Sequence, residues 1–210
     1  MRRDDELLEA WRDGDQQAGR QLFARHYDAV DRFFHNKVGP EAPDLVQKTF
    51  LGCLETIEAD RYEYRDNFRS WLFGIAYRQL CKHYRTRARD RLKFDVGTLS
   101  AHDLDPTPSS IVARSEEEKL LLAALRQIPI EHQVALELHY WEQMSDAQIA
   151  RTLELPLGTI KSRIRRARQL LAERLAELST SPAQLESTLA DLEGWARRLR
   201  DHALGDKPGG

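Results

Sequence analysis

Cationic and hydroxyl side chains gather between Pro156 and Leu171, a stretch that contains no carboxylate. The residues in it that suit contact with DNA are Thr159, Lys161, Ser162, Arg163, Arg165, Arg166 and Arg168. Lysine and arginine neutralise phosphates and also hydrogen-bond to guanine in the major groove. The alternative is a solvated basic helix face, but such faces normally interleave glutamate with their basic residues. The pattern therefore favours DNA binding.

Two helices joined by a tight turn must position these side chains. Ser145 and Gln148 have the spacing of a capping box, which starts a first helix. Pro156 ends it, because proline disfavours the helical conformation in the preceding residue. A second helix then has one apolar face, formed by Ile160, Ile164, Ala167, Leu171, Leu175 and Leu178. The spacing predicts a helix-turn-helix whose second helix lies in a major groove.

A second set of basic residues accompanies aromatic ones further towards the N-terminus. A helix predicted from Phe68 to about Lys93 has an outer stripe made of Asn67, Trp71, Gly74, Arg78, Lys82 and Arg85. The loop before it contains Tyr62, Tyr64 and Arg65. Aromatic rings stack on unpaired bases while cations follow the phosphates, so the combination suits single-stranded or melted nucleic acid. The alternative is a packed Trp71 beside a solvated charged face.

Two earlier helices supply a core and an outward face. A helix that ends at about Val38 should bury Leu22, Phe23, Tyr27, Val30, Phe33 and Phe34. A helix over residues 43–59 turns Asp44, Gln47, Lys48 and Leu51 outward. An exposed leucine is usually an ordinary surface residue, but it also suits a protein docking face.

The fold class predicted from these patterns is all-α, with two small helical domains joined by a flexible linker. Residues 1–94 form the first domain, 95–114 an acidic linker without helical period, and 115–178 the helix-turn-helix domain. Residues 179–210 form a C-terminal extension with a disordered end. Residues 183–203 of this extension are predicted to form an amphipathic C-terminal helix, whose apolar stripe consists of Leu185, Leu189, Leu192, Ala196 and Leu199.

The net charge, the cysteine count and the absence of certain motifs exclude several classes of function. The net charge is −2 over 210 residues, so any DNA affinity must come from local clusters. The two cysteines do not suggest a disulfide framework, and no signal peptide or membrane-length apolar run is present, so we expect a cytoplasmic protein without membrane insertion. We find no catalytic nucleophile with a base, no metal-ligand motif and no phosphate-binding glycine loop. We therefore expect no enzyme activity, metal or cofactor.

Two blocks of sequence resemble bacterial RNA polymerase sigma factors of the sigma-70 family, in particular the extracytoplasmic-function (ECF) group. Residues 44–50 read DLVQKTF and are similar to the D-L-V-Q-E-T-F of that family; residues 68–76 read FRSWLFGIA and resemble F-R-x-W-L-x-x-I-A. Residues 148–150 and 157–163, QIA and LGTIKSR, resemble E-I-A and L-G-T-V-K-S-R. The two blocks stand in the family's order on either side of the linker.

The resemblance implies a role for each surface. Asp44, Gln47, Lys48 and Leu51 would dock on the clamp of core polymerase. The loop over residues 62–67 would hold a base flipped from the minus-ten element, while Trp71, Arg78, Lys82 and Arg85 hold the melted strand. The helix-turn-helix would read the minus-thirty-five element, with Lys161, Ser162 and Arg166 on base edges and Arg163, Arg165 and Arg168 mainly on phosphates.

The chain also departs from the family pattern. Tyr77 and Arg78 stand where arginine and asparagine are frequent, and Lys82 stands where an acid is common. These changes leave the preferred minus-ten sequence open. The expected partners are core RNA polymerase and promoter DNA, both duplex and single-stranded, and an anti-sigma protein is left open. The alternative function is a stand-alone helix-turn-helix transcription regulator.

Overall fold

The computed structural model describes residues 2–59, 67–89, 99–104, 115–179 and 192–197. The backbone in these ranges is helical, and its one strand-like feature is an isolated antiparallel bridge between Ser100 and Pro129. The all-α prediction is confirmed. No helix among the described residues is both long and apolar enough to cross a bilayer.

The N-terminal group of helices packs around one part of the core. It comprises α1 (Asp4–Arg12), α2 (Gln16–Val38), the 3-10 turn η1 (Gly39–Glu41), α3 (Ala42–Glu58) and α4 (Phe68–Arg89). Asp15 caps α2 by accepting hydrogen bonds from the backbone N–H groups of Gln17 and Ala18. Gly39 ends α2 with φ of 55°, a left-handed conformation that glycine adopts at little cost.

The C-terminal group of helices contains the predicted helix-turn-helix. It comprises α6 (Glu116–Gln127), α7 (Ile130–Leu136), the π-helical segment η2 (Glu137–Trp141), α8 (Asp146–Thr152) and α9 (Leu157–Leu178). Ser115 caps α6 by accepting from the N–H of Glu118. Helix α6 ends at Gln127, before Pro129, which is the N-cap residue of α7.

The linker is more ordered in part than the sequence indicated, whereas the C-terminal extension is helical, as predicted, in the part that the structure describes. Within 95–114 we expected no helix, but α5 (Ala101–Leu104) is a helical turn with Ala101 fully buried. Burial of this one apolar residue and the Ser100–Pro129 bridge explain the turn. In the extension, residues 192–197 are helical and bury Leu192, Ala196 and Trp195, of which the sequence predicted the first two. The remainder of 179–210 beyond Ser179 lies outside the described residues.

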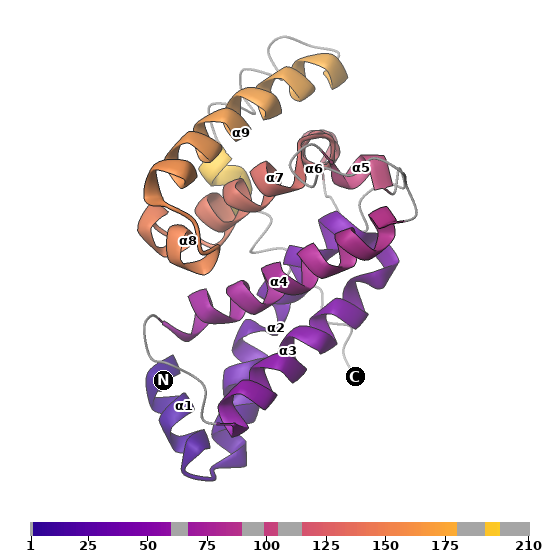
Figure 1. The fold of residues 1–210 in the computed structure, drawn as a ribbon. Coiled ribbons are helices and arrows are strands. Elements are labelled where there is room, and N and C mark those ends of the chain that lie inside the picture. Colours follow the sequence, from indigo (N-terminus) through magenta and orange to yellow (C-terminus); the bar gives the residue numbers. More distant parts are fainter. Residues whose placement is uncertain (1, 60–66, 90–98, 105–114, 180–191, 198–210) are drawn as a thin grey trace.

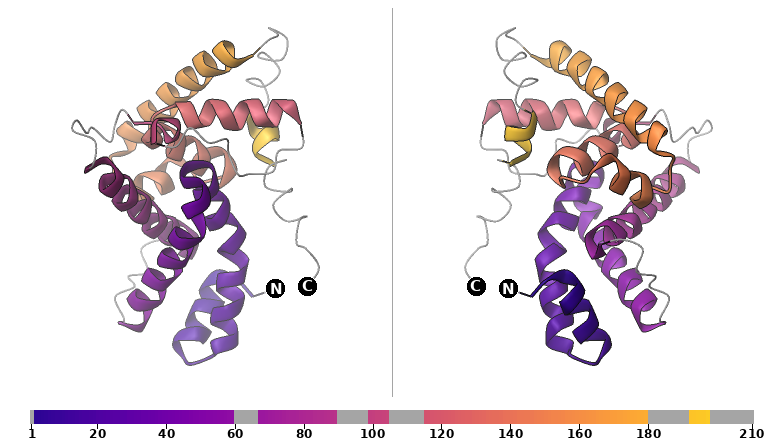
Figure 2. Two further views of the ribbon diagram at one scale, coloured as in Figure 1. Left: turned by 90° about the vertical axis from the view of Figure 1, so that its right-hand side faces the viewer. Right: turned by 90° about the vertical axis from the view of Figure 1, so that its left-hand side faces the viewer.

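Helix α4 lies between the two groups. Figure 1 shows α1, α2 and α3 on one side of α4 and α8 with α9 on the other, and α4 packs directly on α3 and on α8. The two views in Figure 2 place α1 at the end of the molecule remote from α9. The helix predicted to hold a melted strand is therefore also one of the helices on which the two groups meet.

Candidate nucleic-acid interface

The helix-turn-helix is built as the sequence predicted. The Ser145 hydroxyl accepts from the Gln148 N–H at 3.3 Å, and the Gln148 side chain accepts from the Ser145 N–H at 2.9 Å. The turn after α8 contains Glu154 with φ of 57°, in the left-handed region that a residue with a Cβ rarely adopts. Ile149 and Ile160 are fully buried, and they fix α9 against α8.

The outer face of α9 is open to solvent. Lys161, Ser162, Arg165, Arg166 and Arg168 are exposed, while Thr159 is half-buried. Arg166 has a loose ion pair with Glu173 at 3.7 Å, and both side chains are more than half exposed. An exposed pair of this kind is weak, so the guanidinium can exchange it for a phosphate or a base.

The inner face of α9 agrees with the predicted apolar stripe except at its end. Ile160, Ile164, Ala167, Leu171 and Leu175 are buried, but Leu178 is 36% exposed. Leu178 is the last residue of α9.

Arg163 points to the protein rather than to solvent. Its side chain is 13% exposed, and it forms an ion pair of 2.5 Å with Glu131 of α7. Tyr77 of α4 lies close enough for the positive charge of Arg163 to affect its pKa. Burial raises the pKa of Tyr77 to about 12, and the positive charge of Arg163 acts in the opposite direction.

The start of α4 brings two of the predicted strand-binding residues together. Asn67 caps the helix, because its side-chain oxygen accepts from the Ser70 N–H at 2.8 Å. One turn later Trp71 is half-buried, with its ring 5.7 Å from that of Phe68. The predicted loop residues Tyr62, Tyr64 and Arg65 lie outside the described residues.

The rest of the α4 stripe divides into a covered middle and an exposed end. Gly74 is buried, and a Cβ added there would lie 3.2 Å from the carbonyl oxygen of Thr152 in α8. Arg78 forms an ion pair of 3.1 Å with Glu154, in the turn after α8. Lys82 and Arg85 are exposed beyond this contact. The sequence pattern gave no sign that α8 covers this stripe.

The outward face of α3 is exposed as predicted. Asp44, Gln47 and Lys48 are exposed, and Leu51 is 47% exposed. Sequence reasoning missed one neighbour: Tyr27 of α2, predicted in the core, is 48% exposed and stacks on Phe50 with 6.1 Å between the ring centroids. Tyrosine suits a half-covered position, because its ring packs against apolar neighbours while its hydroxyl remains in contact with solvent. The helical pattern treats tyrosine as an apolar residue and therefore did not predict this exposure.

Charged residues that the sequence did not single out join the two groups of helices. The Glu142 carboxylate, 4% exposed, accepts from Arg32 of α2 at 3.3 Å and also from Arg69 of α4. Lys37 of α2 donates to Glu137 in a fully enclosed pair. Burial lowers the pKa of Lys37, and the attraction of Glu137 opposes that effect. Buried charges of this kind are tolerated only when paired and hydrogen-bonded.

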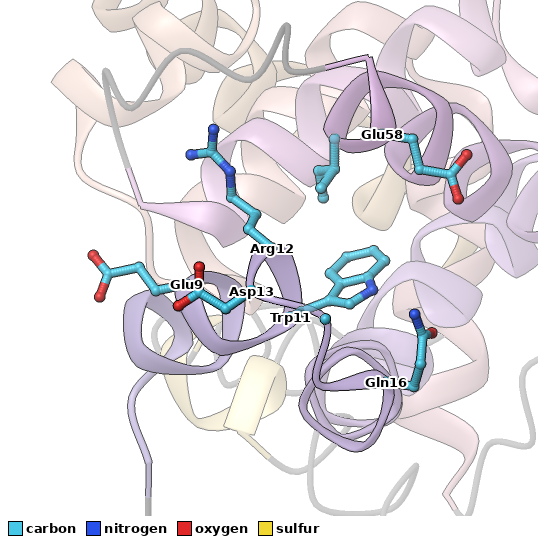
Figure 3. Close-up of a pocket in the computed structure, with 8 residues that line it drawn as sticks. Glu9, Trp11, Arg12, Asp13, Gln16 and Glu58 are labelled. Carbon is cyan, nitrogen blue, oxygen red and sulfur yellow. The ribbon is translucent and has the colours of Figure 1, made fainter.

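A surface hollow of about 720 Å³ lies where the α1–α2 junction meets the end of α3 (Figure 3). Its charged lining residues are Glu9, Arg12, Asp13 and Glu58, so carboxylates outnumber the single cation. This charge does not favour phosphate, and neither nucleic-acid surface includes the hollow. Among the described residues no group of three or more histidine, cysteine or acidic side chains is placed to hold a metal ion.

Comparison with known proteins gives two family matches in chain order. Residues 22–90 match the family described as "Sigma-70 region 2", and residues 118–171 match "Sigma-70, region 4". An ECF RNA polymerase sigma-E factor of Haemophilus influenzae is 30% identical over 187 residues, which cover 83% of this chain and 96% of the relative. The RNA polymerase sigma factor CarQ of Myxococcus xanthus is 32% identical over 184 residues, covering 84% and 100%.

Solved structures show the same fold. CnrH, solved in complex with the cytosolic domain of CnrY, superposes with a TM-score of 0.59 at 25% identity, covering 84% of this chain and 99% of that one. The sigma factor RpoE of Bartonella quintana, solved with the anti-sigma factor NepR, gives a TM-score of 0.58 at 24% identity, covering 75% and 96%.

Proposed function

This chain belongs to the ECF group of RNA polymerase sigma factors, and from that premise we propose which of its surfaces do the work. It is an initiation factor that binds core polymerase, recognises two promoter elements and promotes opening of the duplex. The observation that carries the assignment to residues is the presence of two exposed cationic surfaces, on α9 and on α4, in one chain.

Helix α9 reads the upstream promoter element as duplex. Lys161, Ser162 and Arg166 are exposed along one side of α9 and contact base edges, while Arg165 and Arg168 contact phosphates beside them. Thr159, near the start of the helix, supports the same face. Arg163, paired with Glu131, instead helps to set the angle of α9 on α7. A well-placed bidentate contact to a base discriminates by about 1–3 kcal/mol.

Helix α4 and the loop before it hold the strand that separates. Trp71 offers a ring for stacking near the start of α4, and Arg78, Lys82 and Arg85 follow at helical spacing as phosphate partners. Tyr62, Tyr64, Arg65 and Asn67 belong to the same site by sequence position. Unpairing a base costs a few kcal/mol, and stacking of about 1–3 kcal/mol per base offsets that cost.

Helix α3 docks on the polymerase clamp through Asp44, Gln47, Lys48 and Leu51. Support comes from their exposure on one face, where an apolar side chain lies among polar ones. Tyr27 extends this apolar area from α2. A mixed surface of this kind, with a central apolar residue and a polar rim, is typical of protein interfaces.

The partners are core RNA polymerase and promoter DNA. Two proteins of this fold were solved with a partner, the sigma factor RpoE with an anti-sigma factor and CnrH with a cytosolic domain, which supports a similar regulator for this chain. Because it acts with polymerase on promoter DNA, we place it in the cytoplasm. We assign it no catalytic chemistry of its own.

Run-off transcription with core polymerase on a promoter library tests the function. We expect transcripts from a limited set of promoters that disappear without the chain. Absence of polymerase binding and of promoter-dependent transcripts would exclude a sigma factor.

A stand-alone helix-turn-helix regulator is the less favoured function. It would bind duplex DNA without polymerase, and changes at Asp44, Gln47 or Leu51 would have no effect. Leu51→Ala distinguishes the two functions. A sigma factor with this change loses polymerase affinity while its duplex binding is retained.

A further inference from the structure

The glycine at position 158, in the first turn of α9, is not required by the fold of the described residues. Its φ lies outside the left-handed region, and an added Cβ would meet no atom of those residues within 4 Å. By contrast, Gly14 and Gly39 have a positive φ, and at Gly19 and Gly74 an added Cβ would crowd a neighbour. Glycine destabilises a helix relative to alanine, so the fold alone would favour a larger residue at 158.

Gly158 lies on the face of α9 that is assigned to duplex DNA. Residues four and seven positions apart share one side of an α-helix, so Gly158 lies in line with Ser162 and Arg165. All three are exposed, whereas Ile160 and Ile164 on the other side of the helix are buried. The only glycine of α9 is therefore on its proposed reading face.

Ser162 makes the same face shallow one turn further along the helix. Its hydroxyl donates to the Thr159 carbonyl at 2.9 Å, so the side chain bends back along α9. At 3.6 residues per turn, Lys161 lies on one side of Gly158 and Ser162, and Arg166 lies on the other. Gly158 and Ser162 thus form a shallow strip between long cationic side chains.

The dimensions of the major groove make this strip important. The groove is about 12 Å wide, and a helix with its side chains is roughly 10–12 Å across, so little room is left. A serine hydroxyl lies one bond beyond its Cβ, and it reaches a base edge only if the helix backbone is close to that edge. Because a hydrogen bond between oxygen and nitrogen spans roughly 2.7–3.2 Å, a displacement of about 1 Å breaks it.

We propose that Gly158 is a positioning residue, which allows α9 to lie deep in the major groove so that Ser162 contacts a base edge. A side chain at 158 would hold the helix away from the bases. Phosphate contacts would persist, because long cationic side chains can extend over the added distance. Gly158 thereby determines the specificity for the upstream element more than the overall affinity for DNA. This inference rests on the proposed role of α9 in reading duplex DNA.

Gly158→Ala in the full chain, assembled with core polymerase, tests the inference. Two promoters are compared, one with an upstream element selected from a random library and one with that element scrambled. The ratio of their initial run-off rates at sub-saturating DNA measures how well the element is read. We expect this ratio to fall about tenfold, within the range for loss of one good base contact. The rate on the scrambled promoter should change less than twofold, and the midpoint of thermal unfolding should stay equal or rise.

A double variant and a matched control show whether Gly158 acts through Ser162. Ser162→Ala alone should lower the ratio, but it should add little in the Gly158→Ala background, where its contact is already lost. Ala176→Leu is the control and should leave the ratio unchanged. Ala176 is exposed on the same side of α9, about five turns further along the helix.

The results that overturn the inference differ from those that remove the proposed function. An unchanged ratio in Gly158→Ala, while Arg166→Ala still lowers it, would overturn the inference and leave the function intact. Equal falls in rate on both promoters, or additive losses in the double variant, would overturn it as well. If neither Gly158→Ala nor Arg166→Ala changes the ratio, α9 does not read the element, and the inference fails with that role.

Discussion

Side chains of the same type on α9 have different environments, and this difference decides what each can do. Arg165 and Arg166 are exposed, whereas Arg163, between them and Ser162 on the helix, is enclosed with Glu131. An arginine that is already paired and buried gains little from a phosphate, because it would have to give up its partner first. Contacts to DNA are therefore best tested at the exposed positions.

Arg166→Ala should weaken binding to the upstream duplex by about 1–3 kcal/mol, because it removes one cation in reach of base edges. Polymerase affinity should not change. Anisotropy titrations with promoter duplex and with core polymerase measure both quantities. Arg174→Ala is the matched control: Arg174 lies further along the same helix, outside the residues predicted to contact DNA, and pairs with Glu177. Equal loss of duplex and polymerase binding in Arg166→Ala would contradict the assignment.

Arg163→Ala and Arg165→Ala should affect different properties: the first the stability of the fold, the second the salt dependence of DNA binding. Loss of Arg165 should reduce the slope of log affinity against log salt by about 1, since one phosphate contact disappears. Loss of Arg163 should leave that slope unchanged and lower the midpoint of thermal unfolding, because Glu131 loses its partner. Titrations at several salt concentrations and a thermal melt distinguish the two. A reduced slope in Arg163→Ala would place that residue on the DNA after all.

Trp71→Ala should impair opening of the promoter more than formation of the closed complex. The ring is half-buried against Phe68 and is proposed to stack on an unpaired base, which contributes about 1–3 kcal/mol. Permanganate footprinting reports the melted bases, and a gel shift at low temperature reports the closed complex. Unchanged permanganate reactivity would show that Trp71 is only a packing residue.

At the scale of elements, the ends of the helices follow local chemistry. Ser145 caps α8 and Pro156 stands at the break before α9, as their positions predicted. Asp15 and Ser115 cap α2 and α6 in the same way, and Gly39 ends α2. These features depend on atoms within one turn of the chain, so they can be recognised from spacing alone. The exposure of Tyr27 cannot, because it depends on how far α3 covers α2.

The packing of α1 on α2 leaves no room for a side chain at Gly19 of α2. A Cβ at this position would lie 2.8 Å from the Trp11 ring, which holds α1 on α2. Gly19→Ala should destabilise the fold by about 1–3 kcal/mol through overpacking, less the roughly 1 kcal/mol that alanine gains in a helix. Urea unfolding measures the difference. Gly158→Ala, with open space around the added methyl, is the control and should cause no loss.

At the scale of the whole molecule, the two groups of helices are joined through ionised side chains. Lys37 and Glu137 form the most enclosed of these pairs, with Lys37 also donating to the Phe33 carbonyl at 2.5 Å. A fully buried pair adds little over an apolar pair of equal volume, but a lone buried charge costs several kcal/mol. The Lys37–Glu137 pair therefore determines the orientation in which the two groups of helices dock, and it contributes little to the strength of that docking.

Lys37→Met should lower the free energy of unfolding by about 3–5 kcal/mol, since Glu137 would remain buried without its partner. The double variant Lys37→Met with Glu137→Leu should recover most of that loss. A double-mutant cycle in urea measures the coupling. Additive effects of the two single changes would mean that the pair does not act as a unit.

The sequence by itself determined the helices, their caps, the buried face of α9 and the outward face of α3. These follow from spacing along one helix, where periods of three and four residues decide which side chains share a face. Only the tertiary structure decided that Arg163 belongs to Glu131, that Glu142 joins Arg32 to Arg69, and that α8 covers Gly74. Each of these depends on residues far apart in the chain, and their meeting follows from how whole helices dock, which no local period encodes.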